Sequence, residues 1–226
     1  PRTPLLTFEQ EGYIFMATSG GTVKKTALKE FAFIPSSGKI ALGLDEGDTL
    51  EWVRYTSGED EVMLATAQGK SIHFKETDVR PMGRTARGVR GIRLGPGDSV
   101  IGMVRLHEDK DLLIVTENGY GKRTAYGEFT LQNRGGSGLI AARVTRKTGH
   151  VCSIRSAGDE DEVLLISQKG IIIRSKVSTI SRIGRATQGV KLMNLDEGDK
   201  VAACALVVKE EELEEEEGEE EGNGDS

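Results

Sequence analysis

The stretch Asp111-Leu112-Leu113-Ile114-Val115-Thr116-Glu117-Asn118-Gly119-Tyr120-Gly121-Lys122-Arg123-Thr124 decides the fold class. A short apolar run ends in a glycine turn and is followed by a second short run, which is the pattern of a β-hairpin. The same pattern occurs three more times, with turn glycines Gly21, Gly69 and Gly170. Because the turn glycines recur about every 50 residues, the chain is built from four copies of one unit.

Each unit continues in the same way after its hairpin. A loop ends in a second glycine, which is Gly38, Gly88, Gly138 or Gly189. We predict a third strand beyond this closing glycine, such as Ile40–Leu44 or Val190–Leu195, and a fourth strand such as Val100–Leu106. A lone hairpin cannot bury its apolar face, whereas neighbouring units stacked side by side can.

Four short strands per unit predict an all-β, propeller-like fold of about four four-stranded blades with little helix. The predicted units span approximately residues 11–57, 58–106, 107–156 and 157–208, and residues 1–208 form one β domain. Residues 209–226 contain ten Glu and one Asp against one Lys. Such a segment cannot bury enough apolar surface to fold, so we predict a disordered acidic tail.

The net charge of −6 hides a basic body, because the tail dominates it. Residues 1–208 carry 29 Lys and Arg against 25 Asp and Glu, and this asymmetry favours contact with nucleic acid. The two cysteines, Cys152 and Cys204, lie in apolar runs without a CxxC partner. We therefore expect reduced, buried thiols and a cytoplasmic location.

The loop Gln132-Asn133-Arg134-Gly135-Gly136-Ser137-Gly138 is the richest copy of the recurring loop. Its glycines permit close approach of a large partner, and its guanidinium and amides suit phosphate oxygens. A solvated turn with one surface arginine is the alternative interpretation of this heptapeptide alone. The repetition of basic residues in all four units favours the interpretation as a phosphate-binding loop.

Basic residues return in the second strand and the following loop of each unit, where a propeller would align them along one rim. Such a rim would neutralise the phosphates of double-stranded DNA without reading bases. The loop of the second unit alone carries Arg84, Arg87, Arg90 and Arg93. The residues predicted to contact DNA are Lys24, Lys25, His73, Lys75, Arg84, Arg87, Arg90, Lys122, Arg123, Gln132, Asn133, Arg134, Gly135, Gly136, Gly138, Arg174, Lys176, Arg182 and Arg185.

The sequence offers no catalytic or metal-binding constellation. His73, His107 and His150 lack metal-ligand spacing to a cysteine or to each other. There is no GxxxxGK[ST] loop for a nucleoside triphosphate. We therefore expect no catalytic residue, metal or cofactor in this chain.

These repeats resemble the carboxy-terminal domain of the A subunit of bacterial DNA gyrase. The heptapeptide resembles that family's gyrase A box, Q-[RK]-R-G-G-[RK]-G, and residues 16–26, 56–64, 88–95 and 118–124 are similar to the family as well. The resemblance covers residues 10 to about 208. It implies a β-pinwheel, a propeller-like fold in which neighbouring blades exchange a strand.

The function that the resemblance implies is wrapping of duplex DNA around the outer rim, in support of ATP-dependent negative supercoiling. It also implies assembly with the rest of the gyrase A protein and with the gyrase B protein as A2B2. The cleavage tyrosine, ATP and Mg²⁺ would belong to other parts of that enzyme.

Two departures from the family pattern stand out. Asn133 and Ser137 replace basic residues of the box, and the box lies in the third of four units, where the family has six blades with the box on the first. We therefore expect that upstream blades are missing from this chain. The alternatives are the equivalent domain of topoisomerase IV and a propeller that binds proteins and no DNA.

Overall fold

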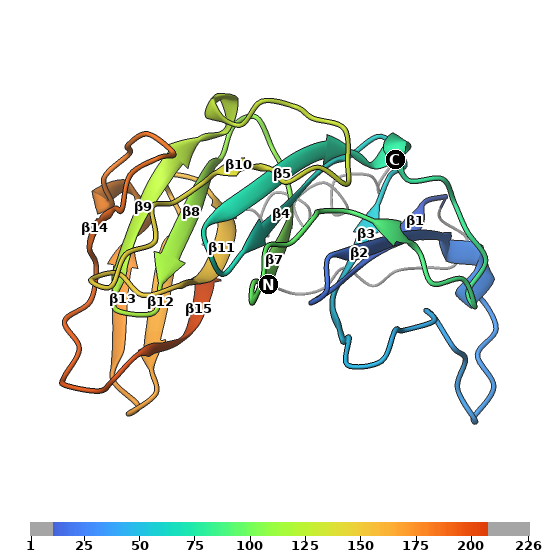
Figure 1. The fold of residues 1–226 in the computed structure, drawn as a ribbon, viewed down its shortest axis with the longest axis horizontal. Helices are drawn as coiled ribbons and strands as arrows, with labels where there is room; N and C mark the ends of the chain where they lie inside the picture. Colours follow the sequence, from blue (N-terminus) through green and yellow to red (C-terminus); the bar gives the residue numbers. More distant parts are fainter. Residues whose placement is uncertain (1–10, 208–226) are drawn as a thin grey trace, which may run out of the picture.

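A computed structural model describes residues 11–207, so the predicted acidic tail lies outside the described residues. Figure 1 shows four antiparallel sheets that follow one another along an arc, from β1 at one end to β12 and β13 at the other. We call these sheets blades 1 to 4 in chain order. The four 3-10 helices of the described part have three or four residues each, so the prediction of an all-β fold with little helix is confirmed.

Each blade is built on the predicted hairpin. The hairpins are β1 (Tyr13–Thr18) with β2 (Thr22–Ala27), β4 (Glu61–Thr66) with β5 (Lys70–Lys75), β8 (Asp111–Thr116) with β9 (Tyr120–Ala125), and β12 (Glu162–Ser167) with β13 (Ile172–Lys176). The turn glycine has a positive φ in all four, as in Gly119 at 78°. A hydroxyl at the end of the first strand caps the turn, since Thr18 Oγ1 accepts the N–H of Thr22.

A 3-10 helix follows each hairpin: η1 (Leu28–Phe31), η2 (Glu76–Asp78), η3 (Tyr126–Glu128) and η4 (Val177–Thr179). The predicted fourth strands are β3 (Leu50–Thr56), β7 (Val100–Arg105), β11 (Val151–Ala157) and β15 (Val201–Val207). Each pairs with the first strand of its own blade. Strand β11 also contacts both β7 and β15, so the fourth strands of blades 2 to 4 lie next to one another.

The third strands are shorter than predicted, and each belongs to the preceding blade. They are β6 (Val89–Arg90), which pairs with β2, β10 (Leu139–Ile140), which pairs with β5, and β14 (Val190–Lys191), which pairs with β9. This is the strand exchange that the resemblance implied. The chain leaves the ladder after two residues because the next two N–H groups both bond to one turn-glycine carbonyl, as Gly91 and Ile92 do with Gly21.

Two expectations about third strands were wrong. Only the first two residues of the predicted strand Val190–Leu195 are extended in a ladder, and Ile40–Leu44 forms no strand. The reason for the second error is that residues 11–207 contain no blade before blade 1, so Ile40 has no ladder to join. Blade 4 has three strands, in the order β13-β12-β15, where the other blades have four, because residues 11–207 contain no following repeat to supply an exchanged strand.

The apolar core lies between successive blades. Alternate residues of β4 serve two clusters: Val62 and Leu64 pack toward blade 1, and Met63 and Ala65 pack toward blade 3. Because both faces are covered, β4 is buried along nearly its whole length. Strand β12 is covered mainly on one face, and its burial alternates residue by residue.

Candidate nucleic-acid interface

The first basic position of the second strand points into the molecule. The side chains of Lys24 and Lys122 are 0% and 1% exposed. Lys24 Nζ donates to Ala41 O at 2.8 Å and to Arg84 O, and Lys122 Nζ donates to Gly184 O at 2.8 Å and to Arg185 O. Burial lowers the pKa of both ammonium groups, that of Lys122 to about 8. These lysines hold the loop of the next repeat against the blade.

The second basic position is also internal. Lys25 Nζ donates to Glu76 O at 3.0 Å, His73 Nδ1 lies 2.9 Å from Phe129 O, and Arg123 Nε donates to Ile180 O at 2.9 Å. Each acceptor belongs to the 3-10 helix of the following repeat or to the residue just after that helix. The three side chains therefore connect each blade to the next one.

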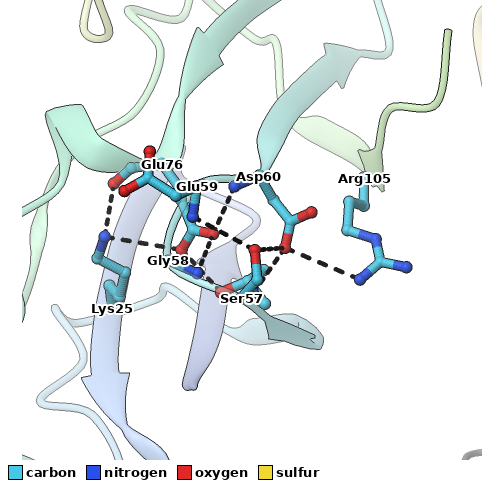
Figure 2. Close-up of polar contacts among 8 residues, drawn as sticks. Lys25, Ser57, Gly58, Glu59, Asp60, Glu76 and Arg105 are labelled. Carbon is cyan, nitrogen blue, oxygen red and sulfur yellow. Dashed lines mark hydrogen bonds and ion pairs between the residues drawn. The ribbon is translucent and has the colours of Figure 1, made fainter. Parts of the chain in front are cut away.

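The blade 1–blade 2 connection shows how a buried cation is balanced. Glu76 is 0% exposed and forms an ion pair with Lys25, with 3.6 Å between Oε2 and Nζ. Its carboxylate also accepts the N–H groups of Gly58 and Asp60 at 2.8 Å each. Figure 2 shows Glu76 and Lys25 beside the turn that carries Gly58 and Asp60, with Asp60 directed toward Arg105. The buried carboxylate is thus paired and hydrogen-bonded, as a buried ion must be.

Five predicted DNA contacts, namely Lys24, Lys25, His73, Lys122 and Arg123, therefore lie inside the blade junctions and not on the rim. The side chains of a strand alternate between its two faces, and one face of an antiparallel sheet is commonly solvated. Both faces of an internal blade are covered in this fold, so alternation leaves no exposed face. The polar groups of these side chains are engaged by protein carbonyls and carboxylates.

The loops between the 3-10 helices and the exchanged strands form the outer side of each junction. One arginine occupies the same position in three of them, four residues before the closing glycine: Arg84, Arg134 and Arg185. Each Nη1 donates to the carbonyl two residues after the closing glycine of the preceding repeat, at Ile40 (3.2 Å), Arg90 (3.1 Å) and Ile140 (2.9 Å) respectively. The arginines thereby tie successive loops into one continuous row, which we call the loop row, while remaining partly exposed.

The heptapeptide 132–138 is held in the loop row by its main chain. Gln132 N–H donates to His73 O at 2.8 Å, and Gly135 N–H donates to Gly91 O at 2.6 Å. A Cβ on Gly138 would lie 2.3 Å from Ser71 O, so glycine is required there by the adjacent blade. The glycines predicted that a large partner approaches this loop closely. In the structure, blade 2 makes that close approach. Asn133 and Gly136 are exposed.

The remaining predicted cations are exposed. Lys75, Arg87, Arg90, Lys176 and Arg182 reach solvent, as does Arg174. Three of these form ion pairs at the surface: Arg87 with Asp45, Arg174 with Glu162, and Arg182 with Asp111. An open groove of about 610 Å³ between blades 1 and 2 is lined by Arg87, Arg90 and Arg93. Three guanidinium groups around one groove suit a phosphate backbone.

Three exposed cations beside the loop row are not among the predicted contacts: Arg93 and Arg143, just after β6 and β10, and Lys191 in β14. Arg143 lies five residues after its closing glycine, as Arg93 does, and Lys191 lies two residues after its own, as Arg90 does. Alignment of the four repeats on the closing glycine would have found Arg143 and Lys191. Within residues 11–207, no group of three His, Cys, Asp or Glu side chains is arranged to hold a metal ion. No helix in that range is both long and apolar enough to span a bilayer.

A protein-family profile described as "DNA gyrase C-terminal domain, beta-propeller" matches residues 12–57, 60–107, 110–155 and 161–207. The chain belongs to this family. The A subunit of DNA gyrase from Escherichia coli (strain K12) is 44% identical over 218 residues, which are 95% of this chain and 25% of that protein. The chain thus spans about a quarter of the length of this relative. The resemblance inferred from the sequence is confirmed.

Two solved structures share the fold of this gyrase C-terminal domain. The C-terminal domain of DNA topoisomerase IV matches with a TM-score of 0.85 and 28% identity, covering 90% of this chain and 64% of that one. The DNA gyrase A C-terminal domain matches with a TM-score of 0.80 and 25% identity, covering 89% and 68%. The predicted propeller-like β-pinwheel is confirmed.

Proposed function

We propose that this gyrase C-terminal domain binds duplex DNA along its loop row and bends the duplex around the arc. The observation that carries the proposal is the repeated placement of exposed cations on successive loops and on the exchanged segments beside them. Arg87, Arg90 and Arg93 surround one groove, and Arg143 and Lys191 lie at positions equivalent to Arg93 and Arg90 farther along. Each phosphate neutralised by such a cation releases a counterion, which makes the contact favourable and dependent on salt.

The loop row is suited to this task because its main chain is fixed before DNA arrives. Arg84, Arg134 and Arg185 hold each loop to the one before it, and Lys24 and Lys122 hold two loops to their blades from inside. Preorganised loops lose little conformational entropy on binding. The contacts would be to backbone phosphates, so sequence preference would come from the deformability of DNA.

In the larger protein, this chain would be a non-catalytic part of a cytoplasmic topoisomerase. The proposed partners are the remainder of the gyrase A protein and the gyrase B protein, in an A2B2 assembly that uses ATP and Mg²⁺ elsewhere. Wrapping by this domain would present a DNA segment for strand passage and so support negative supercoiling. The 44% identity to the gyrase A protein over 95% of this chain supports the assignment.

The equivalent domain of topoisomerase IV is the second candidate, and the TM-score of 0.85 to that enzyme's C-terminal domain favours it. The first candidate requires that binding be accompanied by wrapping of the duplex. A nicked plasmid closed by ligase in the presence of the chain reports this directly. Wrapping changes the linking number of the closed circle, whereas binding without wrapping leaves it unchanged.

The experiment combines this ligation assay with duplex binding over a salt series. The variant Arg87→Gln/Arg90→Gln/Arg93→Gln should bind more weakly and shift the linking number less than the unchanged chain. Arg54→Gln is the control, because Arg54 is exposed on β3, the strand at the opposite edge of the blade 1 sheet from the exchanged strand. If the triple variant and the control lose the same binding free energy per charge removed, binding at the loop row is refuted.

A further inference from the structure

The turn that precedes the fourth strand is longer in the third repeat than in the others. This turn contains a further glycine, which is Gly47, Gly97, Gly149 or Gly198. It comes nine residues after the closing glycine in repeats 1, 2 and 4, and eleven residues after it in repeat 3. Two residues are therefore inserted in repeat 3. In repeat proteins such insertions lie in loops on one face, which is often the binding face.

The inserted residues reverse the charge of this turn. The turn reads Asp45-Glu46-Gly47-Asp48 in repeat 1 and Asp196-Glu197-Gly198-Asp199 in repeat 4, whereas in repeat 3 it reads Thr145-Arg146-Lys147-Thr148-Gly149-His150. Repeat 3 thus places two cations where repeats 1 and 4 each place three acidic side chains. A polyanion would be repelled by the turns of repeats 1 and 4 and attracted by the turn of repeat 3.

Hydrogen bonds fix the main chain of residues 145–149, which we call the insertion loop. Thr148 is 0% exposed, and its Oγ1 accepts the N–H of Thr145 at 3.0 Å. Gly149 N–H donates to Thr145 O at 3.0 Å. From the hairpin turn of the same blade, Asn118 N–H donates to Thr148 O and its Nδ2 donates to Lys147 O, both at 3.0 Å. The insertion loop is thus closed on itself and held to the hairpin turn of blade 3.

The structural role of the insertion loop belongs to its main chain. In repeats 1, 2 and 4 the aspartate after the glycine caps the hairpin turn, as Asp98 does by accepting a main-chain N–H at 2.9 Å. In repeat 3, where His150 stands in place of aspartate, a carbonyl of the insertion loop accepts the equivalent N–H. The side chains of Arg146 and Lys147 take no part in this cap, so the fold does not account for them.

These two side chains are available to a ligand. Arg146 and Lys147 are both exposed, and within residues 11–207 neither forms an ion pair. Arg87, Arg174 and Arg182, in contrast, each pair with a carboxylate. An unpaired cation does not have to give up a protein contact in order to bind a phosphate. The acidic residue of the adjacent hairpin turn, Glu117, is itself paired with Lys200 at 3.2 Å.

A tyrosine connects the insertion loop to the loop row. Lys147 Nζ lies 5.2 Å from the centre of the Tyr120 ring, and Lys191 Nζ of the exchanged strand β14 lies 5.6 Å from it. Both ammonium groups therefore lie against one aromatic ring, which attracts cations. The exposed Arg143 precedes the insertion loop, and its N–H donates to Thr187 O in the next loop of the row at 2.9 Å. The insertion loop thus continues the basic surface of the loop row.

We propose that the insertion loop is a second phosphate-binding element, through which blade 3 holds the duplex beside the loop row. The inference rests on the proposed function, because duplex DNA is the partner. Arg146 and Lys147 each neutralise one phosphate, and Lys191 links this contact to the loop row. The corresponding turns of the other three repeats carry acidic residues and no cation. The duplex therefore approaches this side of the arc at blade 3 and not at blades 1, 2 and 4.

The salt dependence of duplex binding tests the proposal with variants that keep the main chain of the insertion loop. Arg146→Gln/Lys147→Gln should reduce the slope of log K against log salt by about 1.8, since each lost phosphate contact removes about 0.9. Arg146→Lys keeps the charge and should leave the slope unchanged. The matched control is Arg105→Gln/Lys110→Gln, which removes two cations at the end of β7 and just before β8, away from the hairpin turns. It should also leave the slope unchanged.

A second variant removes the insertion outright. Deletion of Arg146 and Lys147 gives repeat 3 the nine-residue spacing of the other repeats and should lower the slope by the same amount. Denaturant unfolding should show that Arg146→Gln/Lys147→Gln is as stable as the unchanged chain, because neither side chain supports the fold.

The outcomes separate this inference from the proposed function. If Arg146→Gln/Lys147→Gln leaves the slope unchanged while Arg87→Gln/Arg90→Gln/Arg93→Gln reduces it, the inference is overturned and binding at the loop row stands. If neither variant changes the slope, both fail. A reduction in Arg105→Gln/Lys110→Gln as large as in Arg146→Gln/Lys147→Gln would mean that net charge alone is responsible, and this result would also overturn the inference.

Discussion

Strands β9 and β13 occupy the same place in their repeats and have opposite environments. In β9 the arginine at the fourth position after the turn glycine, Arg123, has a side chain that is 10% exposed, and it bonds to the next repeat. In β13 the arginine at that position, Arg174, is 62% exposed and pairs with Glu162 in its own hairpin. The two residues have the same chemistry, the same local sequence spacing and the same strand geometry.

This contrast shows that the neighbouring repeat, and not the residue itself, decides whether a basic side chain of this fold is structural or available. A following blade converts Arg123 into a buried connection between blades. The absence of such a blade from the described residues leaves Arg174 in solvent. The same contrast separates Gly119, which is covered by Met193, from Gly170, which has open space around it in residues 11–207.

Alanine substitution of the two arginines should separate them most strongly. Arg123→Ala should lower the free energy of unfolding by about 1.5–3 kcal/mol, because it removes the charged hydrogen bond to Ile180 O and the ion pairs with Asp111 and Asp159. Arg174→Ala should change it by less than about 0.5 kcal/mol, as an exposed ion pair does. Denaturant unfolding followed by circular dichroism measures both. Similar losses in the two variants would contradict the assignment of Arg123 as a connection between blades.

A more modest difference is expected at the turn glycines. Gly119→Ala should destabilise the fold by about 2–3 kcal/mol, because a Cβ would lie 2.4 Å from Met193 O in addition to the strain of a positive φ. Gly170→Ala carries the φ strain alone and should cost about 1 kcal/mol. Thermal unfolding of the two variants gives the difference. Equal costs would mean that the exchanged segment does not pack on Gly119 as described.

The hairpins and the repeat could be predicted from the sequence, and the strand exchange from the resemblance. The burial of the second strand could not be predicted. Side chains alternate between the two faces of a strand, but a local pattern such as Lys24-Lys25 or Lys122-Arg123 does not show whether neighbouring blades cover both faces. The partners of these residues, such as Glu76 and Ile180, lie more than 50 residues away and are unpredictable from local pattern. The exposed loop arginines were predicted because loops lie at the surface whatever covers the strands.

A small effect of pH on stability is expected from the buried lysine of blade 3. Burial lowers the pKa of Lys122 to about 8 in the folded chain, below the roughly 10.4 of an unfolded lysine. Between these values the unfolded state binds more protons, so stability should rise with pH across this window relative to Lys122→Met. Denaturant unfolding of both proteins from about pH 7 to about pH 10.5 checks the sign. A difference that falls with rising pH would mean that the folded site favours the charged ammonium.

The central claim is that the exposed cations of the loop region bind DNA and the buried cations of the strands do not. The salt dependence of duplex binding tests this claim most directly. Arg90→Gln/Arg93→Gln should reduce the slope of log K against log salt by about 1.8, since each lost phosphate contact removes about 0.9. Lys122→Met, shown to be folded by circular dichroism, should leave the slope unchanged even if affinity falls. The reverse result, an unchanged slope in the arginine variant and a reduced slope in the lysine variant, would contradict binding at the loop row.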